Sequence, residues 1–196
     1  HTFYEYVQYV ACRAIVSGYP CGGPGEPCPG AYYRPNNNTT RGQITKMVVI
    51  GSAWPIQTPA VPTFEDVPTT GTFYPYIETA YAHAILSGYP CGTNPNEPCV
   101  APANRPYFRP NNNTTRSQLT KIIVGAKGWG EYAPLTPTFE DVPAFNTFSG
   151  FVERAWKIAS RASPASPTAS RSASASISRR RPARTTAWSS TIRTRV

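Results

Sequence analysis

The sequence is poor in the residues on which much protein chemistry depends. Its 196 residues include only two histidines, one methionine and ten acidic side chains. No apolar run is long enough to cross a bilayer, so we expect no membrane insertion. No Ser-His-Asp set, HExxH motif or phosphate-binding loop is present. We therefore expect neither an enzyme nor a protein that carries a metal or another cofactor.

Positive charge is confined to one end of the sequence. The formal net charge is +9, yet all ten acidic residues and ten of the 19 basic residues lie within 1–156, which makes that part neutral. The whole excess lies in 157–196. The high isoelectric point is therefore no evidence for a nucleic-acid partner of the folded part, and we expect none.

Internal repetition dominates the neutral part. The heptapeptide PTFEDVP occurs at 62–68 and again at 137–143, and the longest repeated stretch, RPNNNTTRGQITK at 34–46, returns as RPNNNTTRSQLTK at 109–121. One repeat is therefore about 70–75 residues long. The predicted divisions are a first repeat that lacks the PTFEDVP leader (1–61), a second repeat (62–136), the start of a third (137–156) and a final segment (157–196).

Each repeat predicts two helices joined by a long loop. Apolar residues recur at helical spacing over 73–86, and Gly88 is placed to end that helix. Thr40 and Thr115 each begin a T-x-x-Q capping box, which predicts the start of a second helix. The chain contains 22 prolines and 14 glycines, many of them between these helices. The predicted class is mainly α with long Pro/Gly-rich loops, in tandem helix-loop-helix repeats.

The order of these motifs resembles the S-layer homology (SLH) module. The resemblance rests on FEDV at 64–67 and 139–142, AILSGY at 84–89 and FRPNNNTTRSQ at 108–118, and it covers 1–156. It implies a secreted protein of the cell surface whose grooves between modules bind cell-wall polysaccharide. Within that resemblance Arg41 and Arg116 match the family's T-R arginine and are candidates to meet acidic groups of the glycan. The structural alternative pairs them with Asp66 or Asp141.

Four of the five cysteines predict local disulfides. Cys21 and Cys28 enclose GGPGEP, and Cys91 and Cys99 enclose GTNPNEP. Two short, equivalent Pro/Gly-rich loops suit disulfides, and neither has the C-x₂-C spacing or the nearby histidines of a metal site. Cys12 is left over on the first helix, where the favoured interpretation is a buried free thiol and the alternative is an intermolecular disulfide.

The two NNNTT segments contain overlapping N-glycosylation sequons. The candidate acceptors are Asn37 and Asn38 in the first repeat, and Asn112 and Asn113 in the second. Capping of the following helix by the threonines explains the same residues without a glycan. Both interpretations stay open at this stage.

The final segment differs in composition from the repeats. Residues 157–196 contain ten serines, eight alanines and nine basic residues, without tyrosine, cysteine or acid. One interpretation is a disordered basic tail. The favoured alternative is that the reading frame of the third repeat is lost after residue 156. At the other end, the chain begins within the repeat pattern and shows no signal peptide, so we expect a mature product or a fragment.

Two functions of different class are compatible with these features. The first is an extracellular structural protein that self-assembles into a surface layer or filament. In that interpretation the partial repeat at 137–156 completes the leaderless first repeat of the next molecule, which gives a head-to-tail polymer of identical copies. The alternative is a monomeric carbohydrate-binding anchor that attaches to cell-wall or surface polysaccharide.

Overall fold

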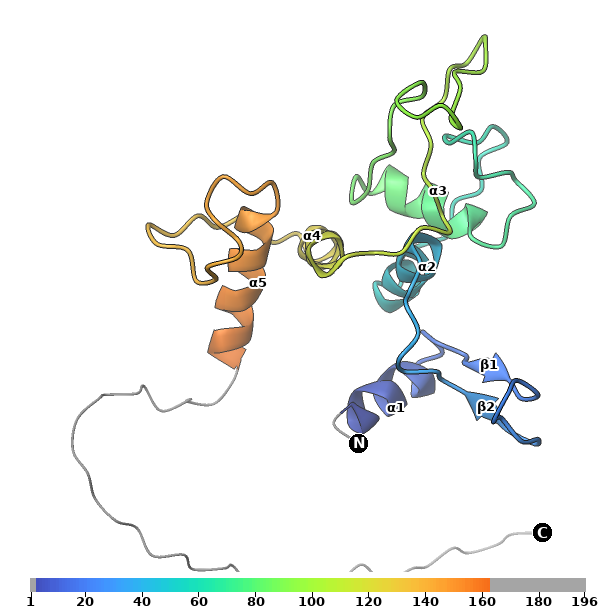
Figure 1. Cartoon of the computed structure of the whole chain (residues 1–196), viewed down its shortest axis with the longest axis horizontal. Coiled ribbons are helices and arrows are strands. Elements are labelled where there is room, and N and C mark those ends of the chain that lie inside the picture. Colours follow the sequence, from blue (N-terminus) through green and yellow to red (C-terminus); the bar gives the residue numbers. More distant parts are fainter. Residues whose placement is uncertain (1–2, 163–196) are drawn as a thin grey trace, which may run out of the picture. The chain divides into compact units, whose positions relative to one another are not determined.

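The computed structural model describes residues 3–162 (Figure 1). These residues form a mainly helical unit, as predicted, with one short antiparallel sheet. Tyr19 pairs with Tyr32 in that sheet, which lies inside the first loop and was not predicted. The elements in chain order are α1 (Tyr4–Cys12), β1 (Tyr19–Pro20), β2 (Ala31–Tyr32), α2 (Arg41–Gly51), α3 (Tyr74–Ala82), α4 (Arg116–Ala126) and α5 (Ser149–Ala162).

The first helix of the second repeat is shorter than predicted. It ends at Ala82, and Ala84 takes the left-handed conformation (φ 55°) in place of Gly88. The N–H of Ala84 donates to the carbonyl of Tyr81 and that of Ile85 to the carbonyl of Ala80, the two hydrogen bonds of a Schellman ending. The prediction that Gly88 ends the helix is therefore wrong.

Gly88 has a packing role instead. A Cβ atom at this position would lie 2.6 Å from the Phe64 ring, so only glycine lets the chain pass so close. Phe64 belongs to a buried cluster that joins the leader of the second repeat to α3 and to the end of the loop. The members of this cluster are Phe64, Val67, Tyr74, Ile77 and Phe108.

Helices of neighbouring repeats pack against each other. The second helix of the first repeat, α2, contacts α3, and α4 contacts α5 in the same way. A buried cluster from α2, the α3 region and α4 fills the junction between the first two repeats. It consists of Ile44, Val49, Ala80, Ile85 and Ile122. Each repeat thus buries its apolar surface against the next, as repeat proteins generally do.

Each leader is bound to its own first helix by a buried glutamate. Both carboxylate oxygens of Glu78 accept hydrogen bonds from Thr63, one from its backbone N–H (2.8 Å) and one from its hydroxyl (2.7 Å). Glu153 accepts the same two bonds from Thr138, at 2.6 and 2.7 Å. The leader of the third repeat therefore contacts α5 of its own repeat. That residues 137–156 complete the first repeat of another molecule stays a prediction.

The leader carboxylate of Asp66 reaches across to the end of the loop. Its two oxygens accept hydrogen bonds from the backbone N–H groups of Phe108 (2.7 Å) and Arg109 (2.6 Å). Neither Arg41 nor Arg116 forms an ion pair with Asp66 or Asp141 among residues 3–162, so the predicted structural alternative for these arginines is wrong. The carboxylate is already occupied by backbone groups.

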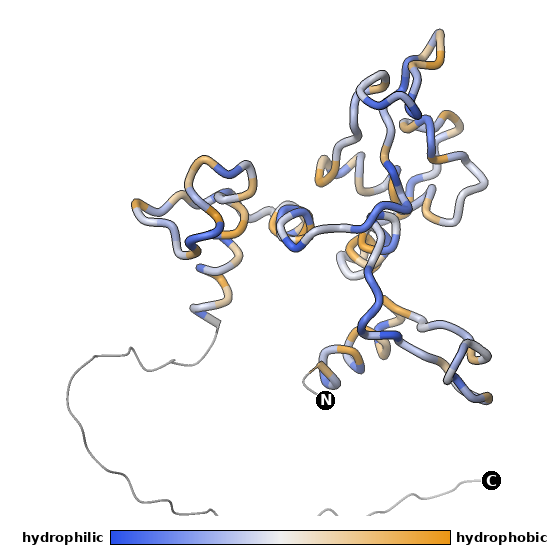
Figure 2. The backbone as a smooth tube through the Cα atoms, in the orientation of Figure 1, coloured by the Kyte–Doolittle hydropathy of each residue, from blue (hydrophilic) through white to orange (hydrophobic). Residues whose placement is uncertain are grey.

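Helix α1 differs from its counterparts because none of its residues is buried. Hydrophobic and hydrophilic positions alternate along it (Figure 2), and its aromatic side chains are accessible. Cys12 is an exposed free thiol, so the favoured interpretation of a buried one is wrong. Its equivalent on α3, Ala82, is exposed as well, although five earlier residues of that helix are buried.

Helix α5 continues past the point where the other first helices end. Lys157 is equivalent to Ala82, yet α5 extends to Ala162. The basic-tail and lost-frame interpretations of 157–196 depend on residues 163–196, which lie outside the described residues. Within the described part, no helix is long and apolar enough to cross a membrane.

Candidate functional site

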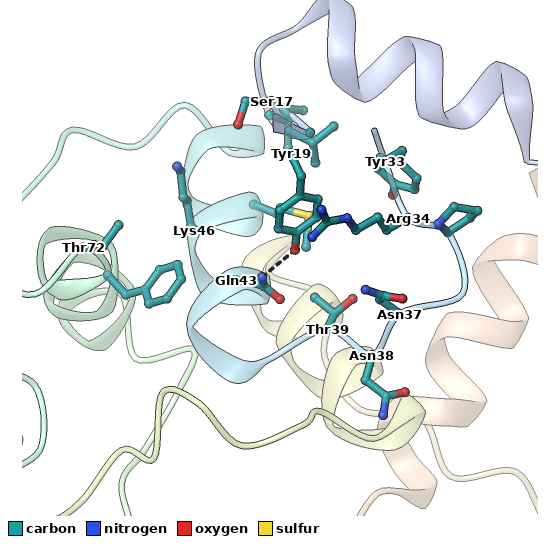
Figure 3. A pocket seen from close by; sticks show the side chains of 16 residues that line it. Ser17, Tyr19, Tyr33, Arg34, Asn37, Asn38, Thr39, Gln43, Lys46 and Thr72 are labelled. Carbon is teal, nitrogen blue, oxygen red and sulfur yellow. Dashed lines mark hydrogen bonds between the residues drawn. The ribbon is translucent and has the colours of Figure 1, made fainter. Parts of the chain in front are cut away.

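Two grooves occupy equivalent positions in successive repeats. Groove 1 has a volume of about 290 Å³ and lies between the first repeat and the start of α3 (Figure 3). Its lining combines aromatic rings, amides and two cations: Ile15, Val16, Ser17, Gly18, Tyr19, Tyr33, Arg34, Pro35, Asn37, Asn38, Thr39, Gln43, Lys46, Met47, Thr72 and Phe73.

Groove 2 is smaller, at about 130 Å³, because an arginine of the first repeat occupies part of it. Its lining repeats that of groove 1 at Ser87, Tyr89, Gln118 and Lys121, and it also includes Arg41. The corresponding space in groove 1 is open. The two grooves are therefore related by the repeat but differ in access.

The Arg41 guanidinium is held by groups of the second repeat. Its Nε donates to the carbonyl of Phe108 at 2.9 Å, and its terminal nitrogens approach the Ser87 carbonyl and the Tyr89 hydroxyl at 3.4 and 3.5 Å. The guanidinium also lies 4.5 Å from the centre of the Phe108 ring. Burial lowers the pKa of Arg41, and the nearby Arg109 lowers it further. Arg41 thus connects two repeats.

The N-terminus of α2 makes the same connection through its backbone. The N–H groups of Arg41 and Gly42 donate to the carbonyls of Asn112 (2.8 Å) and Pro110 (2.9 Å) in the second repeat. The Thr40 hydroxyl accepts from the Gln43 N–H, which completes the predicted capping box. The Thr40 N–H donates in turn to the Gln43 side chain, so all four free N–H groups of the helix start are satisfied, two of them by another repeat.

Arg116 stands at the equivalent position of α4 but is exposed. Its helix has the predicted capping box from Thr115 and Gln118. Within residues 3–162, its side chain forms no hydrogen bond or ion pair. Of the two arginines that sequence reasoning nominated, the structure places Arg41 inside an inter-repeat junction and Arg116 at the surface.

The cysteine loops carry a glutamate to the edge of each groove. The structure contains both predicted disulfides, Cys21–Cys28 and Cys91–Cys99. In the first loop Glu26 accepts two hydrogen bonds from Arg34, at 2.8 and 2.7 Å, and the guanidinium lies 4.5 Å from the centre of the Tyr19 ring. We call this Glu–Arg pair the carboxylate brace.

The second loop repeats the brace with shorter contacts. Glu97 accepts from Arg109 at 2.6 Å twice, and Arg109 lies 3.9 Å from the centre of the Tyr89 ring. Hydrogen bonding to Glu26 raises the pKa of Arg34, and the same contact lowers the pKa of Glu26. Hydrogen bonding to Glu97 likewise raises the pKa of Arg109. Such bidentate pairs fix a guanidinium in one orientation.

The sequon asparagines are exposed at both NNNTT segments. Asn37 and Asn38 line groove 1, whereas the backbone of Asn112 supports the N-terminus of α2. Cross-repeat pairing of Thr40 with Asn113 places the two NNNTT segments side by side. A glycan on Asn37 or Asn38 would therefore stand at groove 1.

Three glutamates and one lysine of the site were not predicted from the sequence, because none of them belongs to a recognised motif. The braces of Glu26 and Glu97 could have been found from the E-P-C tripeptide shared by both loops. Glu78 gave a signal too, since a glutamate recurs at the same place in the third repeat. Lys46, which lines groove 1 and pairs with no carboxylate among the described residues, was not distinguished from other surface lysines.

Among residues 3–162, no group of three His, Cys, Asp or Glu side chains is placed to hold a metal ion. The described features define a class of protein, namely a disulfide-bearing tandem-repeat protein with grooves between its repeats. A family model of the S-layer homology domain matches residues 1–45 and 63–120, more than half of the chain. The chain belongs to this family. No curated protein matches it.

Membership of the SLH family indicates the cellular location of the protein. SLH domains belong to cell-surface, envelope-associated proteins, which usually anchor to cell-wall polysaccharide. The two disulfides fit an extracellular location, where oxidising conditions preserve them.

Proposed function

We propose that this protein attaches to the cell envelope by binding a surface polysaccharide in groove 1, as a non-enzymatic binding protein. The observation that carries the proposal is the composition of that groove. Tyr19 and Tyr33 offer rings on which a sugar can stack, and the neighbouring amides offer hydrogen bonds. Its volume of about 290 Å³ approaches the lower end of the range typical of ligand pockets, about 300–1,000 Å³.

Lys46 supports an acidic polysaccharide in preference to a neutral one. Its ammonium group lies 5.5 Å from the centre of the Tyr76 ring and pairs with no carboxylate in the described part of the chain. An uncompensated cation beside aromatic rings and amides suits a sugar carboxylate. Arg41 contributes to the junction at groove 2, so groove 1 is the better site.

The test compares Lys46→Gln with Lys121→Gln in sedimentation assays with cell walls and with the polysaccharide released from them. Loss of one charge-assisted hydrogen bond, about 1.5–3 kcal/mol, should weaken binding by tenfold or more in Lys46→Gln. Lys121 is the equivalent residue beside the occupied groove 2 and provides the matched control. Equal binding by both variants and the unmodified protein would contradict the proposal.

Self-assembly is the second candidate function, and one observation favours it. Four aromatic residues of the α1 region are exposed by more than half: Phe3 (61%), Tyr4 (58%), Tyr6 (73%) and Tyr9 (58%). The equivalent face of α3 is buried under α2 and the leader. An apolar face of this kind suits contact with another copy of the chain.

Electron microscopy and sedimentation velocity test this candidate without reductant. Filaments or sheets that are lost in a Tyr6→Ser/Tyr9→Ser variant would support assembly through α1. A Cys12→Ser variant separates aromatic contact from an intermolecular disulfide. Monodisperse single particles at all concentrations would contradict assembly and leave polysaccharide binding as the function.

A further inference from the structure

The two cysteine loops preserve one feature although they differ in length. Their disulfides close over sequence separations of 7 and 8 residues. Both nevertheless bring a glutamate onto an arginine with two hydrogen bonds, and both place that arginine over a tyrosine ring. Tyr32 and Tyr107 also donate to the equivalent proline carbonyl of each loop at 2.9 Å. Both loops therefore bring a glutamate carboxylate to an arginine, although they differ in length.

Only the first of these braces borders an open groove. Arg34 lines groove 1 (Figure 3), whereas Glu26 contacts Arg34 but does not itself line the groove. In groove 2, by contrast, Arg109 is not part of the lining and Arg41 fills the neighbouring space. The same contact therefore has different consequences for ligands at the two positions.

The brace decides how many cations groove 1 offers to a ligand. Arg34 and Lys46 both line it, and Glu26 neutralises Arg34 through two hydrogen bonds while Lys46 stays uncompensated. We propose that Glu26 is a specificity-determining residue, which weakens the binding of negatively charged sugars in groove 1 by neutralising Arg34. This inference rests on the proposed binding of a polysaccharide in groove 1.

The prediction is a gain of binding on removal of a charge. Glu26→Gln keeps the size of the side chain and one acceptor for Arg34 but leaves the guanidinium charge uncompensated. Affinity for glucuronate, used as the probe, should rise about three- to tenfold, because one repulsive charge close to the groove is removed. Affinity for glucose, a neutral control, should not rise. The gain should shrink in 1 M salt, where screening acts over about 3 Å.

Glu97→Gln is the matched control, since it loses the equivalent brace beside the occupied groove. Both variants should unfold at similar temperatures, and only Glu26→Gln should bind glucuronate more tightly in NMR titrations of the full chain. A weaker or unchanged affinity in Glu26→Gln, an equal gain in Glu97→Gln, or no binding of the probe to Glu26→Gln would each overturn the proposal.

The outcomes separate this proposal from the broader function. Polysaccharide binding that depends on Lys46 but not on the charge at residue 26 would retain the function and overturn the role of Glu26. If Glu26→Gln binds glucuronate more tightly while the unmodified protein does not bind cell-wall polysaccharide, the role of Glu26 would be supported and the proposed function contradicted.

Discussion

Replacement of Asp66 by asparagine should destabilise the protein through the backbone of a distant segment. The carboxylate accepts from the N–H groups of Phe108 and Arg109 at 2.7 and 2.6 Å. Phe108 is 1% exposed, so an N–H group left without an acceptor there is not rehydrated. The Arg109 backbone is also strained, with φ 61°, and the same contact helps to hold it.

The size of the effect follows from these contacts. A hydrogen bond to a charged group contributes about 1.5–3 kcal/mol, and an asparagine oxygen retains one neutral bond of about 1 kcal/mol. We therefore expect Asp66→Asn to lower the free energy of unfolding by about 2–5 kcal/mol. For a chain of this length, such a loss lowers the melting temperature by about 4–20 °C.

Urea unfolding monitored by tryptophan fluorescence measures the change directly. Asp141→Asn is the matched control, since Asp141 occupies the same leader position in the third repeat, is exposed and has no hydrogen bond within residues 3–162. The control should change stability by less than about 0.5 kcal/mol, as surface substitutions usually do. Equal midpoints for the two variants would refute the assigned role of Asp66.

Three further predictions concern backbone strain, charge and the candidate arginines. Ala84→Gly and Ala53→Gly should each raise stability by up to about 1 kcal/mol, because these residues have φ 55° and 52°; a lower melting temperature in either would contradict this reasoning. Because the pKa of Glu26 is lowered, its brace contributes fully above the ordinary value of 4.5 and is lost as the pH falls through the lowered pKa. The stability difference between the unmodified protein and Glu26→Gln should therefore shrink as the pH falls below 4.5, and a difference that does not shrink with falling pH would disprove this reasoning. Arg41→Ala should lower the melting temperature clearly and change glycan binding little, because this side chain connects two repeats. Arg116→Ala should leave the melting temperature nearly unchanged, because this side chain is exposed.

The sequence was most informative where local chemistry decides the structure. The capping boxes of Thr40 and Thr115 and the cysteine pairs depend on residues within a few positions of one another, and the structure contains all of them. The ends of the first helices were harder to predict. Glycine is the usual signal for a left-handed ending, but here Ala84 adopts it and Gly88 serves close packing.

Contacts between repeats could not be read from periodicity. The position of Arg41 depends on carbonyls 46 and 67 residues away along the chain, and the T-R motif gives no indication of them. The inequality of the two grooves has the same origin, because almost identical stretches of sequence line both. Which groove is open depends on the neighbour that reaches into it, and this is a property of the assembled repeats.

The bonds between α2 and the second repeat have a consequence for how such a chain can vary. The backbone carbonyls of Pro110 and Asn112 accept hydrogen bonds from the start of a helix that belongs to the preceding repeat. The segment that folds cooperatively therefore does not begin and end where the sequence repeat does. A cut at a repeat boundary removes the carbonyls that accept hydrogen bonds from the start of one helix, and it exposes the apolar surface of the next helix. Insertion or deletion of one whole repeat, in contrast, recreates the same junction, so arrays of this protein can change length in steps of about 75 residues without a new interface.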